Sequence, residues 1–247
     1  MSAVLMGIAA VALTACQPET SASPQSDRPY EGAMVLAMSW QPAFCENARR
    51  KRECRTQTAE RYDATHFALH GLWPQPGSNV YCGVSAEQEQ LDKSGKWRRL
   101  EIARLPQDLW DRLRRTMPGT QSSLHRHEWV KHGTCYSRDA ETYYAHSLAL
   151  MDAVNASSLR DLFASSIGTR LSNRQIRSAF DTAFGDGAGD RVRVACRRDG
   201  NRQLIVELTL GLKGRVTNAP DMAMLIQNAP KTDPGCPGGI IDRAGFQ

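Results

Sequence analysis

Seven cysteines are distributed along the 247 residues, and their positions limit both the fold and the compartment of this protein. Cys16 lies apart from the others, and the remaining six are an even number that suits disulfide pairing. No two of them form a C-x-x-C pair, so the spacing does not indicate a zinc site. Disulfides form in oxidising compartments, and we therefore expect an exported protein. The spacing alone leaves the pairing of the six cysteines open.

The N-terminus supports export. Residues 1–15 form an apolar run that is too short to span a bilayer comfortably and predicts the hydrophobic part of a signal peptide. The run ends in Leu13-Thr14-Ala15-Cys16, which resembles the lipobox of bacterial lipoproteins, in which the cysteine carries the lipid. Ala15 also suits ordinary cleavage without lipid, and no Lys or Arg precedes the run. We expect a periplasmic or secreted protein and not a reduced intracellular one, and we favour an outer-membrane lipoprotein over ordinary cleavage without lipid.

The rest of the chain has the composition of one soluble domain. Residues 16–29 are rich in Ser, Pro, Gln and Thr and predict a flexible tether between the anchor and a domain that covers residues 30–247. Hydrophobic residues make up 41% and charged residues 23% of the chain, which is ordinary for a globular protein. The net charge of +5, carried mostly by arginine, weakly favours a polyanionic partner. We expect a monomer with no internal repeat.

Hydrophobic periodicity predicts an α+β fold for this domain, with a central antiparallel sheet and helices packed on it. Apolar or alternating segments predict strands at 32–39, 65–72, 192–194 and 204–210, the last two joined by a hairpin at Asp199-Gly200. Spacings of three and four residues predict helices at 105–117, 123–132, 139–155, 159–165 and 173–184. Residues 75–96 are polar and turn-rich, so we expect a loop there.

The segment His127-Glu128-Trp129-Val130-Lys131-His132-Gly133-Thr134-Cys135 concentrates chemically active side chains. In an α-helix each residue advances about 100°, so the two histidines, the glutamate and the lysine fall within an arc of about 140°. Gly133 is then expected to end the helix in the left-handed conformation. One side of the helix would then carry two imidazoles, a carboxylate and an ammonium. This combination indicates chemistry on a phosphate.

A metal site is the first alternative for this segment. Zinc sites of the H-E-x-x-H type carry their histidines four residues apart on one helix face, with the glutamate as base. Here His127 and His132 are five residues apart, which separates them by about 140° on an α-helix. The residue four positions after His127 is Lys131, a cation. We therefore expect no metal and no other cofactor, and a metal-dependent phosphoesterase is disfavoured.

RNA cleavage beside a 2′-hydroxyl suits these residue types without a metal. The reaction needs a base for the 2′-hydroxyl proton, an acid for the leaving 5′-oxygen, and cations for the phosphate charge. Histidines, with ordinary pKa values of about 6.5, suit both proton transfers, and Lys131 suits the developing charge. Glu128 fits beside a phosphate if it is protonated or orients its neighbours. The second histidine is expected to be His70, at a strand end before Gly71 and Pro74.

Two segments of the sequence resemble the active-site segments of the ribonuclease T2 family. The first is His70-Gly71-Leu72-Trp73-Pro74, preceded by Phe67-Ala68-Leu69, and the second is residues 127–135. Outside them the likeness is weaker and extends from about residue 33 to 236. The resemblance implies a metal-independent endoribonuclease of α+β fold that cleaves single-stranded RNA with low base specificity. Its products would be 2′,3′-cyclic phosphates, which are then opened more slowly to 3′-phosphates.

The same resemblance implies roles for the site residues. In the first step His132 would be the general base and His70 the general acid, and the two would exchange roles in the second step. Glu128 and Lys131 would stabilise the transition state. His127 would hold the phosphate.

The resemblance also implies binding and structural residues. Trp73 would support a base-binding pocket and Tyr81 would stack on a base, although each aromatic could equally well be structural. The implied disulfides are Cys45–Cys54, Cys82–Cys135 and Cys196–Cys236. Residues 49–52, inside the first of these loops, are all basic; we expect a solvated loop, with contact to an RNA backbone as the alternative.

A non-catalytic RNA-binding or host-interaction protein of the same fold is the second hypothesis for this chain. A binder needs cations, but it does not need a matched acid and base. The complete set of histidines, carboxylate and lysine therefore favours an enzyme. Product analysis separates the two hypotheses, because a binder yields no cyclic phosphate.

Overall fold

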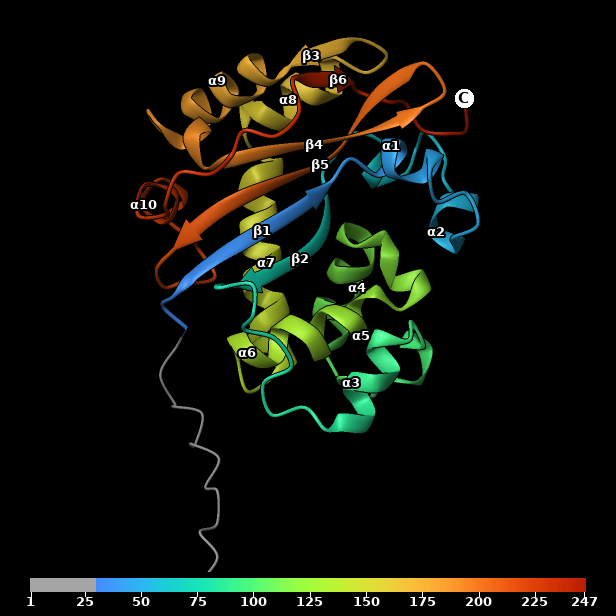
Figure 1. Ribbon diagram of the computed structural model, residues 1–247, viewed down its shortest axis with the longest axis vertical. Coiled ribbons are helices and arrows are strands. Elements are labelled where there is room, and N and C mark those ends of the chain that lie inside the picture. Colours follow the sequence, from blue (N-terminus) through green and yellow to red (C-terminus); the bar gives the residue numbers. More distant parts are fainter. Residues whose placement is uncertain (1–29) are drawn as a thin grey trace, which may run out of the picture.

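The computed structural model describes residues 30–247. The expected signal peptide of residues 1–15, the lipidation site Cys16 and the tether of residues 16–29 lie outside the described residues. Within this described part, six strands form one sheet: β1 (Ala33–Ser39), β2 (Ala68–Pro74), β3 (Arg170–Ser172), β4 (Val192–Asp199), β5 (Arg202–Lys213) and β6 (Gly238–Ile240). Their order is β2-β1-β5-β6-β3, with β4 paired to β5 (Figure 1).

The long strands pair antiparallel, as expected from the sequence. β1 pairs with β2 on one side and β5 on the other, and β4 pairs with β5. β6 pairs antiparallel with β3 but joins β5 in parallel through Leu204 and Ile240, so the sheet is mixed rather than wholly antiparallel. The hairpin between β4 and β5 turns at Gly200, whose φ of 55° favours glycine. The expected hairpin is therefore confirmed.

The expected helices around the sheet are present, with small shifts at their ends. They are α4 (Gln107–Thr116), α7 (Ala140–Asn155), α8 (Ser158–Ser165) and α9 (Asn173–Phe184). Local capping sets two of the starts, since Asp139 caps α7 and Ser172 opens α9 with a capping box. α7 passes behind the sheet in Figure 1, and the buried Tyr143 hydroxyl bonds to both the N–H and the C=O of Leu72 in β2. α7 thereby fixes the strand that carries His70.

The segment expected to be a loop contains a helix, α3 (Ala86–Lys93). The Ser85 hydroxyl caps it by accepting a hydrogen bond from the backbone N–H of Gln88. Its sequence AEQEQLDK is polar almost throughout, so no apolar stripe marks it as a helix. Its buried residue is Asp92. Three short helices also escaped prediction because they are too short to show a period: α1 (Gln41–Glu46), α2 (Arg52–Arg55) and α10 (Met222–Gln227).

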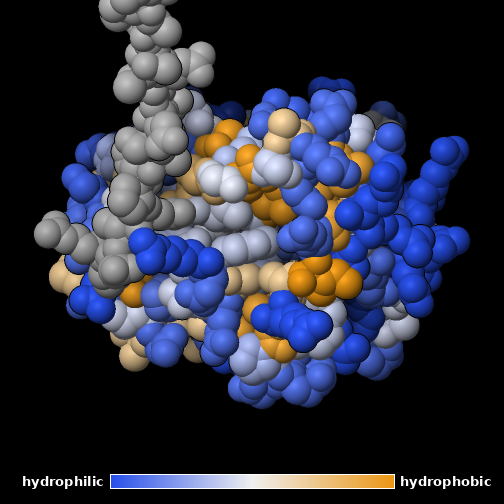
Figure 2. All heavy atoms as spheres, turned by 90° about the horizontal axis from the view of Figure 1, so that it is seen from below, coloured by the Kyte–Doolittle hydropathy of each residue, from blue (hydrophilic) through white to orange (hydrophobic). Residues whose placement is uncertain are grey.

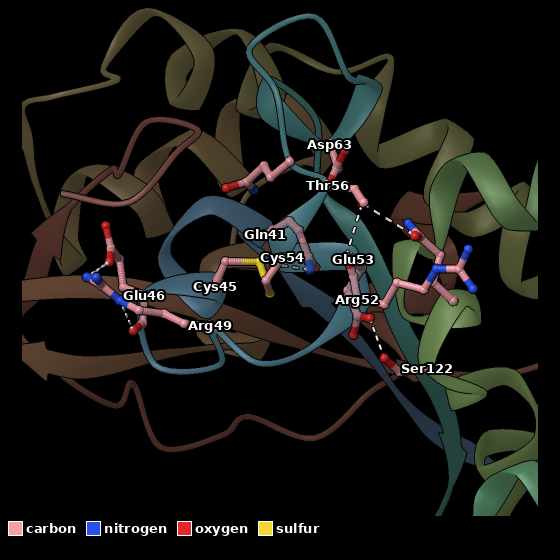
Figure 3. Close-up of a disulfide and its surroundings, with 12 residues drawn as sticks. Gln41, Cys45, Glu46, Arg49, Arg52, Glu53, Cys54, Thr56, Asp63 and Ser122 are labelled. Carbon is pink, nitrogen blue, oxygen red and sulfur yellow. Dashed lines mark hydrogen bonds and ion pairs between the residues drawn. A yellow bond between two sulfur atoms is a disulfide. The ribbon is translucent and has the colours of Figure 1, made fainter.

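Three disulfides join Cys45 to Cys54, Cys82 to Cys135, and Cys196 to Cys236, which are the pairs that the resemblance implies. The first links α1 to α2 (Figure 3). Beside it, Arg49 pairs with Glu46, and the Ser122 hydroxyl donates a hydrogen bond to Glu53. The loop of basic residues is therefore anchored at several points. The second disulfide ties the loop before α3 to the residues that follow His132.

One face of the described part is largely polar. Figure 2 shows a face covered mostly by hydrophilic residues, with hydrophobic residues gathered near its middle. The most exposed large hydrophobic side chains on residues 30–247 are Ile102, Met224 and Phe246. Within the same residues, no helix combines the length and the apolar character needed to cross a bilayer. Buried apolar side chains gather in one core cluster, which gives the site a rigid frame.

Candidate active site

His70 lies at a β-bulge within β2 and not at the end of a strand. Ala37 of β1 pairs with Gly71, and the next residue, Met38, pairs with Leu69. His70 is therefore the extra residue on β2. The strand continues through the Gly and Pro that follow, so the expectation that they end it beside His70 is wrong. A bulge redirects a side chain without breaking the sheet, and the imidazole of His70 is held rigidly while remaining 34% exposed.

Two glutamates contact the two nitrogens of His70. The Nδ1–H donates a 2.5 Å hydrogen bond to Oε2 of Glu207 in β5, and Nε2 lies 3.7 Å from Oε1 of Glu128. Burial alone would lower the pKa of His70. The hydrogen bond to Glu207 and the negative charges of both glutamates outweigh burial and the positive charge of Lys131. The pKa of His70 is therefore raised above its usual value, which favours the imidazolium.

The helix that carries the other site residues is not the continuous α-helix expected over residues 123–132. α5 (Leu124–Glu128) leads into a π-helical turn (Trp129–Gly133), and α6 (Thr134–Tyr136) follows. The i→i+5 hydrogen bonding of a π turn widens the helix, which brings residues five apart nearer to one face. The rings of His127 and His132 are 6.3 Å apart. The angular separation expected from an ideal α-helix therefore does not apply to these two histidines.

Gly133 continues the helix and does not end it. Its φ of −61° and ψ of −38° are helical, so the expected left-handed stop is wrong. A Cβ at this position would lie 2.4 Å from Cε3 of Trp129 and 3.0 Å from Cδ1 of Tyr143. Gly133 is therefore required by the close packing of this segment against α7 and not by a turn.

Glu128 is the buried centre of the site. Its side chain is 1% exposed, and its Oε2 accepts a 2.9 Å hydrogen bond from Nε1 of Trp73. Oε1 has no hydrogen-bond partner among the described residues and lies 3.7 Å from Nε2 of His70 and 3.8 Å from Nε2 of His127. Burial raises the pKa of Glu128, against the lowering effect of both histidines, Trp73 and Lys131. The environment therefore shifts the balance of Glu128 toward its protonated form, and the unpaired Oε1 faces both histidines.

A second buried carboxylate holds His127. The Nδ1–H of His127 donates a 2.7 Å hydrogen bond to Oδ1 of Asp92 in α3, and the Tyr81 hydroxyl donates a 2.8 Å hydrogen bond to Oδ2. On its face, His127 stacks against Trp97 with ring centroids 4.4 Å apart. These contacts leave Nε2 of His127 facing Glu128. Tyr81 is thus anchored through its hydroxyl, and its stacking on a base stays a prediction.

His132 and His70 flank the same indole. The ring centroid of His132 is 5.6 Å from that of Trp73, and His70 meets Trp73 edge-on at 5.2 Å. Nδ1 of His132 is buried without a hydrogen-bond partner among residues 30–247. Burial first, and then the positive charges of Lys131, His127 and His70, lower the pKa of His132 to about 3. At neutral pH His132 is therefore a neutral imidazole, whereas His70 favours its charged form.

The structure brings together the residues from both predicted segments. A chain of pairwise contacts links His70, Trp73, His127, Glu128 and His132, and the charge of Lys131 acts on Glu128 and His132. Tyr81 is connected to them through Asp92. His66 lies elsewhere and stacks on Tyr62 at 3.9 Å.

Sequence reasoning missed three residues of the site. Glu207 carries a weak signal, because it is a carboxylate on the less buried face of an alternating strand. Trp97 lies immediately after the segment expected to be a loop, in a region with no predicted element. Asp92 carries no signal in its polar helix, and only the fold shows that it is buried.

The arrangement offers a proton donor, a proton acceptor and positive charge. Among the described residues, no group of three or more His, Cys, Asp or Glu is placed to hold a metal ion. The site carboxylates of Glu128, Asp92 and Glu207 are each in contact with a histidine. The histidines, carboxylates and lysine of this site can therefore catalyse acid–base chemistry on a phosphate ester.

A model of the Ribonuclease T2 family matches residues 31–222. The chain belongs to the ribonuclease T2 family. It is 29% identical over 243 residues to Ribonuclease I of Escherichia coli (strain K12), with 86% of each chain covered. It is 22% identical over 209 residues to Ribonuclease 1 of Arabidopsis thaliana, covering 81% of this chain and 83% of that protein. The crystal structure of Japanese pear S3-RNase shares the fold, with a TM-score of 0.52 at 16% identity over 86% of this chain and 99% of that one.

Membership of the family confirms two predictions. The fold is the α+β fold of ribonuclease T2 proteins, and the chain is an endoribonuclease of the T2 type. The three disulfides are typical of proteins that fold in an oxidising compartment, such as the periplasm or the extracellular medium.

Proposed function

We propose that this ribonuclease T2 protein cleaves single-stranded RNA by transphosphorylation, with His132 as the first general base and His70 as the first general acid. The observation that carries the assignment is the opposite proton preference of two histidines on one indole. Environments that push two pKa values apart separate an acid from a base. The pKa of His132 is lowered to about 3, and that of His70 is raised. His132 is thus held in the neutral form that a general base needs, and His70 is shifted toward the protonated form that a general acid needs.

Each proton has an assigned atom in this mechanism. Nε2 of His132 takes the 2′-hydroxyl proton, since its Nδ1 is buried. The 2′-oxygen attacks phosphorus, and the bond to the 5′-oxygen breaks while Nε2 of His70 supplies the proton to that oxygen. The product is a 2′,3′-cyclic phosphate. In the slower second step water attacks phosphorus after giving a proton to His70, and the leaving 2′-oxygen takes the proton back from His132, which leaves a 3′-phosphate.

Three further residues act on the charge of the phosphate. Lys131 offers an ammonium to the non-bridging oxygens, where negative charge develops. In its protonated form Glu128 donates a hydrogen bond to the phosphate from Oε1, the oxygen that lies between His70 and His127; in its charged form the same oxygen orients both histidines. His127 holds the phosphate through Nε2, because its Nδ1–H is engaged by Asp92.

Removal of either proton-transfer group tests the proposal. His70→Ala and His132→Ala should each lower the rate of dinucleotide cleavage by about 10²–10⁴-fold. Cyclic phosphate should accumulate before 3′-phosphate in mass spectra of wild-type products. A rate close to that of the wild type in either purified variant would overturn the role assignment. Loss of activity in EDTA would revive a metal-dependent mechanism, and RNA binding without any cyclic product would favour the binder.

Base recognition is proposed to be weak. Trp73 is half-buried and its ring contacts the rings of His70 and His132. The Tyr81 hydroxyl is hydrogen-bonded to Asp92. Neither aromatic is therefore free to select one base strongly. A panel of dinucleotides should therefore show kcat/KM values that differ little between bases. A strong preference for a single base would contradict low specificity.

Export and anchoring are proposed from the sequence of residues 1–29. Residues 1–15 would be removed as a signal peptide, Cys16 would carry lipid, and residues 16–29 would tether the catalytic domain of residues 30–247 to the outer membrane. Labelling with a radioactive fatty acid should mark the wild type and not Cys16→Ala. An unlabelled wild type would indicate ordinary cleavage without lipid, which releases the protein into the periplasm or the medium. Light scattering would then test whether the released protein is a monomer.

A further inference from the structure

Glu207 in β5 contacts the proposed general acid, His70, from across the sheet. Its carboxylate accepts the Nδ1–H of His70, although β1 separates the two strands that carry these residues. Strands two places apart in a sheet are roughly 10 Å apart. Both side chains must therefore reach over β1 to meet.

The residues of β1 under this contact are small. Ser39 pairs with Glu207 on β5 and with Ala68 on β2, so these side chains share one face of the sheet. Ala37, two residues before Ser39, lies on the same face. A larger side chain at either position would fill the space that the hydrogen bond crosses. The bulge at His70 completes the arrangement, since it redirects the imidazole out of the regular ladder.

The contact is selective. Within residues 30–247 the hydrogen-bond and ion-pair partner of the Glu207 side chain is His70, and no lysine or arginine pairs with Glu207. The other charged or titratable groups around His70 lie on the helical segment: Glu128 at 3.7 Å, Lys131, which acts through its charge, and His132, whose pKa the charge of His70 helps to lower. Of all these groups, Glu207 is the one that contacts Nδ1.

We propose that Glu207 is a positioning residue that makes His70 an effective general acid. The inference rests on the proposed role of His70. By accepting the Nδ1–H, the carboxylate fixes the tautomer, directs Nε2 to the leaving 5′-oxygen and stabilises the imidazolium. Glu207 itself touches neither the phosphate nor a base.

Two variants separate orientation from charge. Glu207→Gln keeps an oxygen that can accept the Nδ1–H but removes the charge, so kcat should fall mildly and the alkaline limb of the pH profile should move to lower pH. Glu207→Ala removes both and should lower kcat by about 10- to 100-fold with KM nearly unchanged. NMR titration of the His70 ring in Glu207→Gln should show a lowered pKa, and this measurement does not depend on activity. Thr209→Val, two residues along the same strand and face, is the matched control and should behave like the wild type.

A substrate with an activated leaving group isolates the acid step. A nucleoside 3′-(4-nitrophenyl phosphate) releases nitrophenolate, which needs no proton. His70→Ala and Glu207→Ala should therefore both cleave this ester at nearly the wild-type rate. His132→Ala should remain inactive on it. If Glu207→Ala loses the same factor on the ester as on a dinucleotide, or if Glu207→Gln leaves the pH limb and the His70 titration unchanged, the inference is wrong. Retained dinucleotide cleavage by His70→Ala would instead overturn the proposed function.

Discussion

Gly71 lies directly against Glu128: a Cβ on Gly71 would stand 2.0 Å from Glu128 Oε2 and 2.5 Å from Trp73 Nε1. The hydrogen bond between Trp73 and Glu128 occupies the space that a side chain would need. A glycine beside the bulge thus lets β2 approach the helical segment closely enough to share one site.

Gly71→Ala should therefore abolish most activity while leaving a folded protein. The methyl group must displace Glu128, and a misplacement of about 1 Å can cost about 10²-fold in rate. Dinucleotide kinetics and thermal unfolding measure the two effects. Gly77→Ala is the matched control, because a Cβ there meets nothing within 4 Å. Equal activity in the two variants would show that the contact with Glu128 has no catalytic consequence.

The pH profile should extend far into the acid range. In kcat/KM, which reports the free enzyme, activity should rise as His132 loses its proton at about pH 3 and fall as His70 loses its own proton, at a pH above the ordinary pKa of a histidine. The lowered pKa keeps the base neutral, and the raised pKa keeps the acid charged. Dinucleotide cleavage from pH 2 to pH 9 tests this expectation. An acid limb near pH 6.5 would show that burial does not control His132.

Asp92→Asn should weaken substrate binding more than chemistry. The amide cannot accept hydrogen bonds from both His127 and Tyr81 as the carboxylate does, so the ring of His127 loses its fixed direction. KM should rise about 10-fold, with a smaller change in kcat. Tyr81→Phe removes the other bond to Asp92 and leaves the bond to His127, so its KM should stay near that of the wild type. A large fall in kcat for Asp92→Asn would assign His127 to the chemical step.

The basic loop should bind RNA beyond the cleaved phosphate through Lys51. Its Nζ lies 5.4 Å from the centroid of Trp97, the ring on which His127 stacks. Lys51→Ala should raise KM for polymeric RNA several-fold and reduce the salt dependence, while a dinucleotide is unaffected. Arg49→Ala is the control of equal charge, since Arg49 pairs with Glu46 (Figure 3) and also packs on Phe246. Equal effects would indicate a general charge effect.

His125 should make the protein less stable in acid. Burial first and the charge of Arg126 second lower its pKa to about 4, and its Nδ1 has no partner among residues 30–247. Between pH 6.5 and 4 the imidazole of His125 binds a proton in the unfolded chain but not in the folded chain. The free energy of unfolding therefore falls as pH falls. The loss is at most about 3 kcal/mol. His125→Phe should flatten this dependence in urea unfolding at pH 7, 5.5 and 4; parallel curves would show that His125 does not contribute.

The sequence by itself determined the residues of the chemistry and most of the local elements. The helices α7 and α9 follow from apolar spacing and from caps at Asp139 and Ser172, which are interactions between residues close in the chain. His70 and the segment from His127 carried the resemblance to the family. The function and the fold class could therefore be predicted without coordinates.

Tertiary structure decided how those residues meet, because each deciding contact joins segments far apart in the chain. The bulge at His70 depends on its register with β1, and the π turn depends on Trp129 and Gly133 packing against α7. Asp92 and Glu207 become partners of histidines only when α3 and β5 are in place. Burial and charge at those contacts, and not residue type, set opposite pKa shifts on His70 and His132.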